Sequence, residues 1–84
     1  AAITGMREFL GAYPEHELAD NAQYWLGEAY YVTRDYENAI AAFTGVGERW
    51  PQSSKAPGAL LKLGFAQFEL KRFGAARQTL GQVG

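Results

Sequence analysis

The stretch YWLGEAYYVTRDYENAIAAF, residues 24–43, decides the fold of this chain. Aromatic side chains crowd it, namely those of Tyr24, Trp25, Tyr30, Tyr31, Tyr36 and Phe43. Such a cluster can pack a core, hold a cofactor or bind a partner. The rest of the sequence separates these readings, because parts of this stretch recur further along the chain.

The sequence resembles itself at an offset of 37 residues, and internal repeats of this length are typical of solenoids. Leu26-Gly27 aligns with Leu63-Gly64, and Ala39 aligns with Ala76. The same offset pairs Tyr13 with Trp50, Pro14 with Pro51, Tyr31 with Phe68, Tyr36 with Phe73, Phe43 with Leu80, and Ile3 with Ile40. Residue size and polarity therefore repeat along the whole chain.

Each copy reads as two helices, because its apolar residues recur at helical spacing and no stretch alternates with period two. We expect an all-α solenoid of antiparallel helix pairs, in which each unit buries its apolar face on its neighbours. The expected helices span about 1–12, 18–33, 36–48, 56–70 and 73–83. We expect one domain, 1–84, in which 1–14 hold the second helix of a truncated repeat, 15–51 a full repeat and 52–84 a second repeat truncated at its end.

Helix boundaries follow from capping residues and prolines. Asp35 is placed to cap the helix that starts at residue 36, and Pro51 ends that helix. Ser53 or Ser54 caps the next start, and Pro57 falls in a first turn, where its missing N–H costs little.

Two glycines lie in helix interiors, where glycine costs about 1 kcal/mol relative to alanine. Gly27 and Gly64 occupy the same position in both copies, which predicts that the paired helix approaches closely there. Ala39 and Ala76 serve the same role from the other side. The large core partners are Tyr30, Phe43 and Leu80.

This pattern resembles the tetratricopeptide repeat (TPR), which has Leu-Gly, Tyr, Ala, Phe, Ala and Pro at set offsets. The matching residues are Leu26, Gly27, Tyr30, Ala39, Phe43, Val46 and Pro51 in one copy and Leu63, Gly64, Gln67, Ala76, Leu80 and Val83 in the next. Gln67 departs from the expected Tyr and weakens one inter-helix contact. The resemblance implies a right-handed superhelix whose concave groove binds other proteins.

The period of 37, with YPEHELADNAQYWLGEAYY and RDYENAIAAF, also resembles the C-terminal domain of the periplasmic Tol–Pal-associated YbgF (CpoB) family. That resemblance implies a fragment of a periplasmic protein whose signal peptide and trimerising coiled coil lie outside this sequence. It also implies TolA and a penicillin-binding protein as partners, and a role in coordinating envelope constriction during cell division. The outer-membrane assembly lipoprotein BamD has repeats of the same length, so a BamD-like scaffold is an alternative.

In the first helix of a copy, Ala22, Leu26 and Ala29 share the side that faces the core. A second arc lies roughly opposite and is largely apolar. It holds Tyr24, Glu28 and Tyr31 in one copy and Leu61, Phe65 and Phe68 in the next. We predict that this arc lines the concave groove and binds a partner segment. The predicted binding residues are Asn21, Tyr24, Trp25, Glu28, Tyr31, Leu61, Lys62, Phe65 and Phe68. Two alternatives stay open: a following helix pair buries these residues, or the repeats mainly self-associate into a homo-oligomer.

Some TPR domains hold a C-terminal carboxylate with Lys and Asn side chains on this face. Lys62 is the only possible remnant of that clamp, so an apolar or helical partner segment is favoured. The net charge of −1 without a basic block gives no footprint for nucleic acid. No apolar run is long enough for membrane insertion. We expect no enzyme activity, no cofactor and no metal site; the only histidine, His16, lies in an expected solvated turn.

Overall fold

The computed structural model describes residues 2–83, and those residues form five helices and no strand. The helices are α1 (Ala2–Ala12), α2 (Ala19–Val32), α3 (Tyr36–Arg49), α4 (Ala56–Glu69) and α5 (Phe73–Gly81). The predicted all-α class is confirmed, and each helix begins and ends within two residues of its expected bounds.

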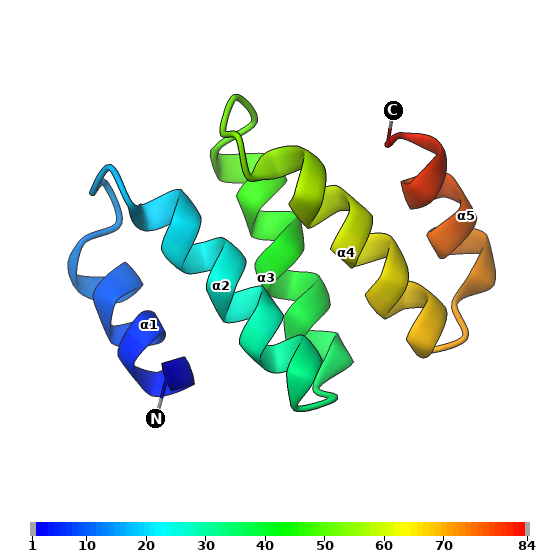
Figure 1. Ribbon diagram of the computed structural model, residues 1–84, viewed down its shortest axis with the longest axis horizontal. Helices are drawn as coiled ribbons and strands as arrows, with labels where there is room; N and C mark the ends of the chain where they lie inside the picture. Colours follow the sequence, from blue (N-terminus) through cyan, green and yellow to red (C-terminus); the bar gives the residue numbers. More distant parts are fainter. Residues whose placement is uncertain (1, 84) are drawn as a thin grey trace.

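Consecutive helices pack side by side and run in opposite directions, as Figure 1 shows. α2 and α4 run the same way and touch each other, and α3 lies behind and between them. This is the predicted TPR-type solenoid. The Cα trace measures 36 × 27 × 13 Å, so the fold is only about two helices thick. Within residues 2–83, no helix combines the length and hydrophobicity needed to cross a membrane.

The connections between helices repeat at the same offset as the sequence. The Asp35 N–H donates to the Tyr30 carbonyl over 2.8 Å, and the Arg72 N–H donates to the Gln67 carbonyl over 2.9 Å. Both bonds close the end of a helix in a Schellman arrangement. The residue before each donor, Arg34 or Lys71, has a positive φ of 65° or 62°. Glycine is usually required there, so both repeats tolerate the same local strain.

The core forms where small residues let two helices meet, as predicted. A Cβ on Gly27 would lie 2.6 Å from Phe43 Cε1, and one on Gly64 would lie 2.5 Å from Leu80 Cδ2. Phe43 is 1% exposed and Ala39 is wholly buried. The glycines are therefore needed because the large partner of each pair occupies the space that a side chain would fill.

Capping differs between the two repeats. The Asp35 carboxylate accepts from the Asn38 N–H at 3.4 Å, so this predicted cap is confirmed. Arg72 holds the matching position in the second repeat and has no capping side-chain bond; it pairs instead with Glu37 of α3. Pro57 lies in the first turn of α4, as expected. Ser53 accepts from the Lys55 N–H and so stabilises the turn before α4 rather than the helix start.

Candidate protein-binding face and groove

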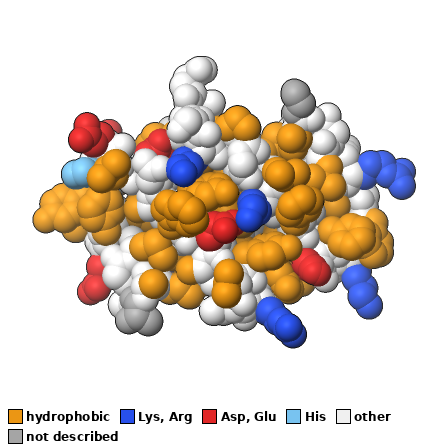
Figure 2. Space-filling view, viewed as in Figure 1, with side chains coloured by type: hydrophobic (Ala, Val, Ile, Leu, Met, Phe, Trp, Pro, Cys, Tyr) orange, Lys and Arg blue, Asp and Glu red, His pale blue; other side chains and the backbone are white. Residues whose placement is uncertain are grey.

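The face formed by α2 and α4 carries large apolar side chains that the fold leaves open. Phe65 is 41% exposed, Phe68 57% and Trp25 50%. Figure 2 shows hydrophobic side chains spread across this side of the molecule, with acidic and basic groups adjoining near its middle. Adjacent exposed aromatic side chains of this kind are typical of protein-binding surfaces.

An ion pair joins the two helices on this face. Lys62 Nζ lies 2.8 Å from Glu28 Oε1, and both side chains are more than two-thirds buried. The Glu28 carboxylate, as hydrogen-bond partner, raises the pKa of Lys62 above its ordinary value, although burial acts in the opposite direction. The positive charge of Lys62 is therefore already paired with the carboxylate of Glu28 within the fold. This weakens further the case for a ligand with a free C-terminal carboxylate.

Tyr24 is the predicted face residue that is most involved in the core. Its ring packs edge-on against Phe43 of α3 with centroids 5.8 Å apart, and against Trp25 at 5.2 Å. Lys55 Nζ lies 5.2 Å from the Tyr24 centroid and 5.1 Å from that of Trp25. Tyr24 thus links α2, α3 and the start of α4, and only part of it remains open.

An edge-on aromatic pair spans the turn between the two helices of each repeat. Tyr31 meets Tyr36 with centroids 5.3 Å apart, and Phe68 meets Phe73 at 5.1 Å. Burial, followed by the nearby charge of Glu69, raises the pKa of Tyr31 above its ordinary value. The predicted residues Tyr31 and Phe68 therefore hold equivalent places, but Phe68 is the more exposed.

Two predicted residues contribute less to the open face. Leu61 is half-buried on α4. The Asn21 N–H donates to Asp20 Oδ1 over 2.8 Å, at the start of α2. Asp20 in turn accepts a hydrogen bond from the Ser53 hydroxyl, which joins α2 to the turn before α4. The hydrogen bond from Ser53 lowers the pKa of Asp20, although burial opposes it.

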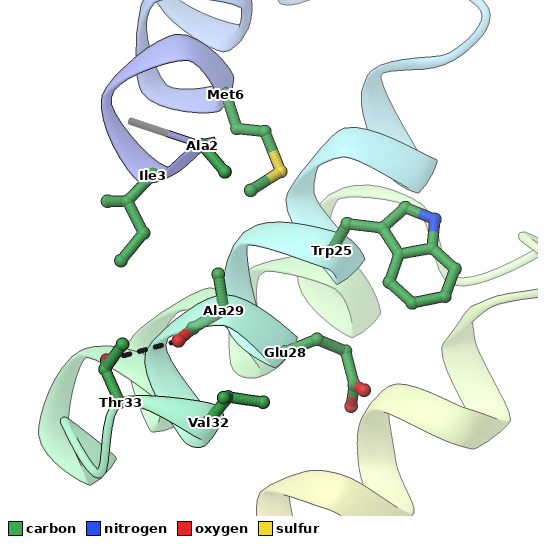
Figure 3. A pocket seen from close by; sticks show the side chains of 8 residues that line it. All are labelled: Ala2, Ile3, Met6, Trp25, Glu28, Ala29, Val32 and Thr33. Atoms are coloured by element: carbon green, nitrogen blue, oxygen red, sulfur yellow. Dashed lines mark hydrogen bonds between the residues drawn. The ribbon is translucent and has the colours of Figure 1, made fainter.

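A groove of about 570 Å³ opens between α1 and α2, and its lining is almost entirely apolar. Figure 3 shows Met6 and Ile3 reaching in from α1 and Trp25 and Val32 bordering it from α2. The full lining is Ala2, Ile3, Met6, Trp25, Glu28, Ala29, Val32 and Thr33. Sequence reasoning placed two of these residues, Trp25 and Glu28, on the binding surface but missed the groove. Val32, at 77% exposure, was the available sign, since it is an apolar residue at the end of a helix.

The histidine has a structural role. His16 Nδ1 accepts a hydrogen bond from the Leu18 N–H at 3.0 Å, and its ring packs edge-on against Phe9. Ser53 Oγ makes the matching bond to the Lys55 N–H, also at 3.0 Å. His16 therefore replaces a serine in the repeated turn. Among residues 2–83, no group of three or more His, Cys, Asp or Glu side chains is placed to hold a metal ion.

Comparison with known families agrees with this repeated architecture. The family described as Tetratricopeptide repeat matches residues 21–53 and 58–84, which together make up most of the chain. A comparison with curated proteins finds no match. With its paired helices, its glycine contacts and its turns all repeating at one offset, the chain belongs to the tetratricopeptide repeat family.

Proposed function

We propose that this chain is a protein-binding module that holds an apolar, helical partner segment on the face of α2 and α4. Tetratricopeptide repeats are protein-interaction modules, and the exposed rings of Phe65 and Phe68 beside the internal Glu28–Lys62 pair are the observation that carries the proposal. Because the charged groups at the centre neutralise each other, the partner needs little charge of its own. Binding is therefore expected to depend only weakly on salt.

The finer proposal concerns the partner. We propose that the chain works in the periplasm as part of a Tol–Pal-associated protein, binding a TolA segment and supporting envelope constriction in cell division. A penicillin-binding protein is a further proposed partner. The support is the resemblance carried by YPEHELADNAQYWLGEAYY and by the period of 37 residues. Calorimetric titration of the chain with purified TolA tests it, and absence of saturable binding would reject the Tol–Pal assignment.

The face itself is tested by a double variant, Phe65→Ala with Phe68→Ala. Both rings are exposed, so the fold should survive while the affinity for TolA falls by roughly ten-fold or more, as expected when two aromatic anchors are lost. Tyr24 is unsuitable because its ring packs on Phe43. Tyr13→Ala is the matched control, since Tyr13 is 58% exposed but lies in the turn between α1 and α2. Unchanged affinity in the double variant, with circular dichroism also unchanged, would show that the face is wrongly assigned.

A further inference from the structure

The first turn, residues 13–18 between α1 and α2, has a counterpart in the second turn, residues 50–55 between α3 and α4. The two turns share a backbone contact. The His16 N–H donates to the Tyr13 carbonyl over 3.1 Å, and the Ser53 N–H donates to the Trp50 carbonyl over 3.0 Å. Each turn therefore places an aromatic ring at the same point, directly after the last residue of a helix.

In the second turn, this ring is covered by a cation from the same chain. Arg49 is the last residue of α3, and its guanidinium carbon lies 4.4 Å from the centroid of the Trp50 ring. Two effects favour a positive charge at this point. The electron-rich face of the ring attracts it, and the last carbonyl groups of the helix carry partial negative charge. The fold itself thus shows where a cation lies beside such a ring.

The first turn has the ring but lacks the cation. Ala12 occupies the position of Arg49, and the last turn of α1 contains no basic residue. The Tyr13 side chain is 58% exposed. It is held by the rings of Phe9 and His16, whose centroids lie 5.6 and 6.4 Å from its own. A ring supported in this way loses little conformational freedom when a ligand covers it.

The first turn is also more acidic than the second. Glu15 and Glu17 stand where the second turn has Gln52 and Ser54. Within the part of the chain that the structure describes, neither of these two carboxylates forms an ion pair. Figure 2 shows acidic side chains beside the pale blue histidine, next to hydrophobic side chains at one end of the molecule. The carboxylates add to the attraction for a cation beside Tyr13.

The exposure of the first turn does not depend on the chain ahead of α1. In the second turn, α2 already packs against both α3 and α4. Gln52 and Ser54 are nonetheless exposed there, and Trp50 is only half-buried. A helix that packed in the same way on α1 and α2 would therefore leave the two glutamates in water and the Tyr13 ring partly open.

We propose that the first turn binds an arginine side chain of a partner protein, with the guanidinium group over the Tyr13 ring and near Glu15 and Glu17. Arginine fits better than lysine, because its planar group stacks on a ring and bonds a carboxylate through two N–H groups. The proposal goes beyond the α2 and α4 face and uses none of its residues. In contrast to binding on that face, binding here should weaken as salt is added, since the charges are exposed.

The probe is an acetylated and amidated peptide of alternating glycine and arginine residues. Backbone amide signals in nuclear magnetic resonance report where it binds. The signals of Tyr13, Glu15 and Glu17 should shift in a saturable manner, while those of α5 stay in place. A peptide with citrulline in place of arginine is the ligand control, because citrulline has nearly the same shape without the charge. It should produce no saturable shift.

The substitution Ala12→Arg tests the site without removing any side chain that the fold uses, because Ala12 is exposed at the end of α1. The new guanidinium group should cover Tyr13 as Arg49 covers Trp50. Peptide affinity should then fall by about two- to five-fold, the range expected for an exposed cation–aromatic contact. Ala12→Gln is the matched control, since it adds a long side chain without a charge and should leave the affinity unchanged.

A crossed test separates this site from the proposed TolA face. Tyr13→Ala should lower peptide affinity by about two- to five-fold and leave the affinity for TolA unchanged. The Phe65→Ala, Phe68→Ala chain should show the opposite, with normal binding of the arginine peptide. Circular dichroism checks that each variant keeps its helices.

Three results would overturn the proposal. One is equal binding of the citrulline and arginine peptides, or binding of neither, because the charge would then play no part. Another is equal peptide affinity in Ala12→Arg and Ala12→Gln, which would place the peptide elsewhere. The third is a shift of the same amide signals with protein concentration alone, together with a doubled mass in sedimentation. That result would assign the first turn to a contact between two copies of this chain.

Discussion

Gly27 shows at the scale of one residue how this fold is specified. Glycine weakens a helix, yet it is retained in the middle of α2 because the ring edge of Phe43 occupies the place of a Cβ. Gly64 has the same relation to Leu80, but Leu80 is only half-buried and its side chain can rotate. The same sequence feature is therefore more costly to alter in the first repeat than in the second.

The substitution Gly27→Ala should destabilise the chain by about 1–2 kcal/mol in urea unfolding, because overpacking against a buried ring outweighs the gain in helix propensity. Gly47→Ala in α3 is the matched control. Nothing lies within 4 Å of a Cβ there, so that variant should be more stable by up to about 1 kcal/mol. Equal stability of the two variants would contradict the role assigned to the Phe43 contact.

Gln67 is the residue at which the second repeat departs from the first. It replaces the buried Tyr30, and within the described residues its Oε1 atom is buried without a hydrogen-bond partner. The sequence predicted a weaker contact at this position. The structure adds the reason, since an unsatisfied amide oxygen costs free energy that an aromatic ring would not.

At the scale of elements, the helices are held together by side chains that reach across a repeat. Asp20, in the first turn of α2, accepts from the Ser53 hydroxyl before α4, and Gln23 Nε2 donates to the Ala42 carbonyl of α3 at 3.0 Å. The offset in sequence revealed neither bond, because position 57, which is equivalent to 20, holds a proline, and position 60, which is equivalent to 23, holds a leucine. Such contacts depend on the relative placement of helices.

The Asp20–Ser53 bond predicts a pH dependence of stability. The pKa of Asp20 is lowered in the folded state, so its stabilisation is present above the unfolded pKa of about 3.9 and is lost as the pH falls through the lower folded value. A double-mutant cycle of Asp20→Ala and Ser53→Ala should give a coupling of about 1 kcal/mol at pH 7. The coupling should shrink below pH 4.

The control for this cycle pairs Asp20→Ala with Ser54→Ala, since Ser54 is exposed and adjacent to Ser53. No coupling is expected for that pair at any pH. The loss of the bond from Ser53 to the Lys55 N–H affects both arms of the main cycle equally and so cancels. A coupling that stayed constant between pH 7 and pH 3 would reject the charge on Asp20 as its source.

At the scale of the whole molecule, contacts form almost entirely between consecutive helices, with α2 and α4 the additional pair. Stability in such a solenoid is a sum over neighbouring units. α3 is central, since it packs on both α2 and α4, whereas α1 contains no buried residue and α5 packs on α4 alone. The ends of the chain are therefore held less firmly than its middle.

Native-state hydrogen exchange should show this gradient. Amides of α3 and of the facing parts of α2 and α4 should exchange most slowly, while those of α1 and α5 open by local fraying. Leu80→Ala should speed exchange in α5 and leave α3 nearly unchanged. Phe43→Ala, which empties a wholly buried site, should cost about 3–5 kcal/mol and speed exchange in every helix. Uniform protection across all five helices would contradict the neighbour-by-neighbour description.

Much of this organisation follows from the sequence alone. The spacing of Leu26, Ala39 and Phe43, repeated at one offset, determined the helices and their pairing, because apolar residues at helical spacing have to be buried by a neighbouring helix. The same spacing identified Gly27 and Gly64 as points of close contact. These features depend on residues close in the sequence or on contacts that recur between adjacent repeats, so both kinds can be read from the order of residues.

Only the tertiary structure decided how the second apolar arc of α2 is divided. Tyr24 and Trp25 are adjacent, and helical spacing separates them by only about 100°. The position of α3 lets Tyr24 pack on Phe43, while the half-exposed ring of Trp25 contacts only Tyr24 and the ammonium group of Lys55 among the aromatic and cationic groups that the structure describes. The crossing of neighbouring helices determines which side chains are covered, so the groove between α1 and α2 could not be derived from the order of residues.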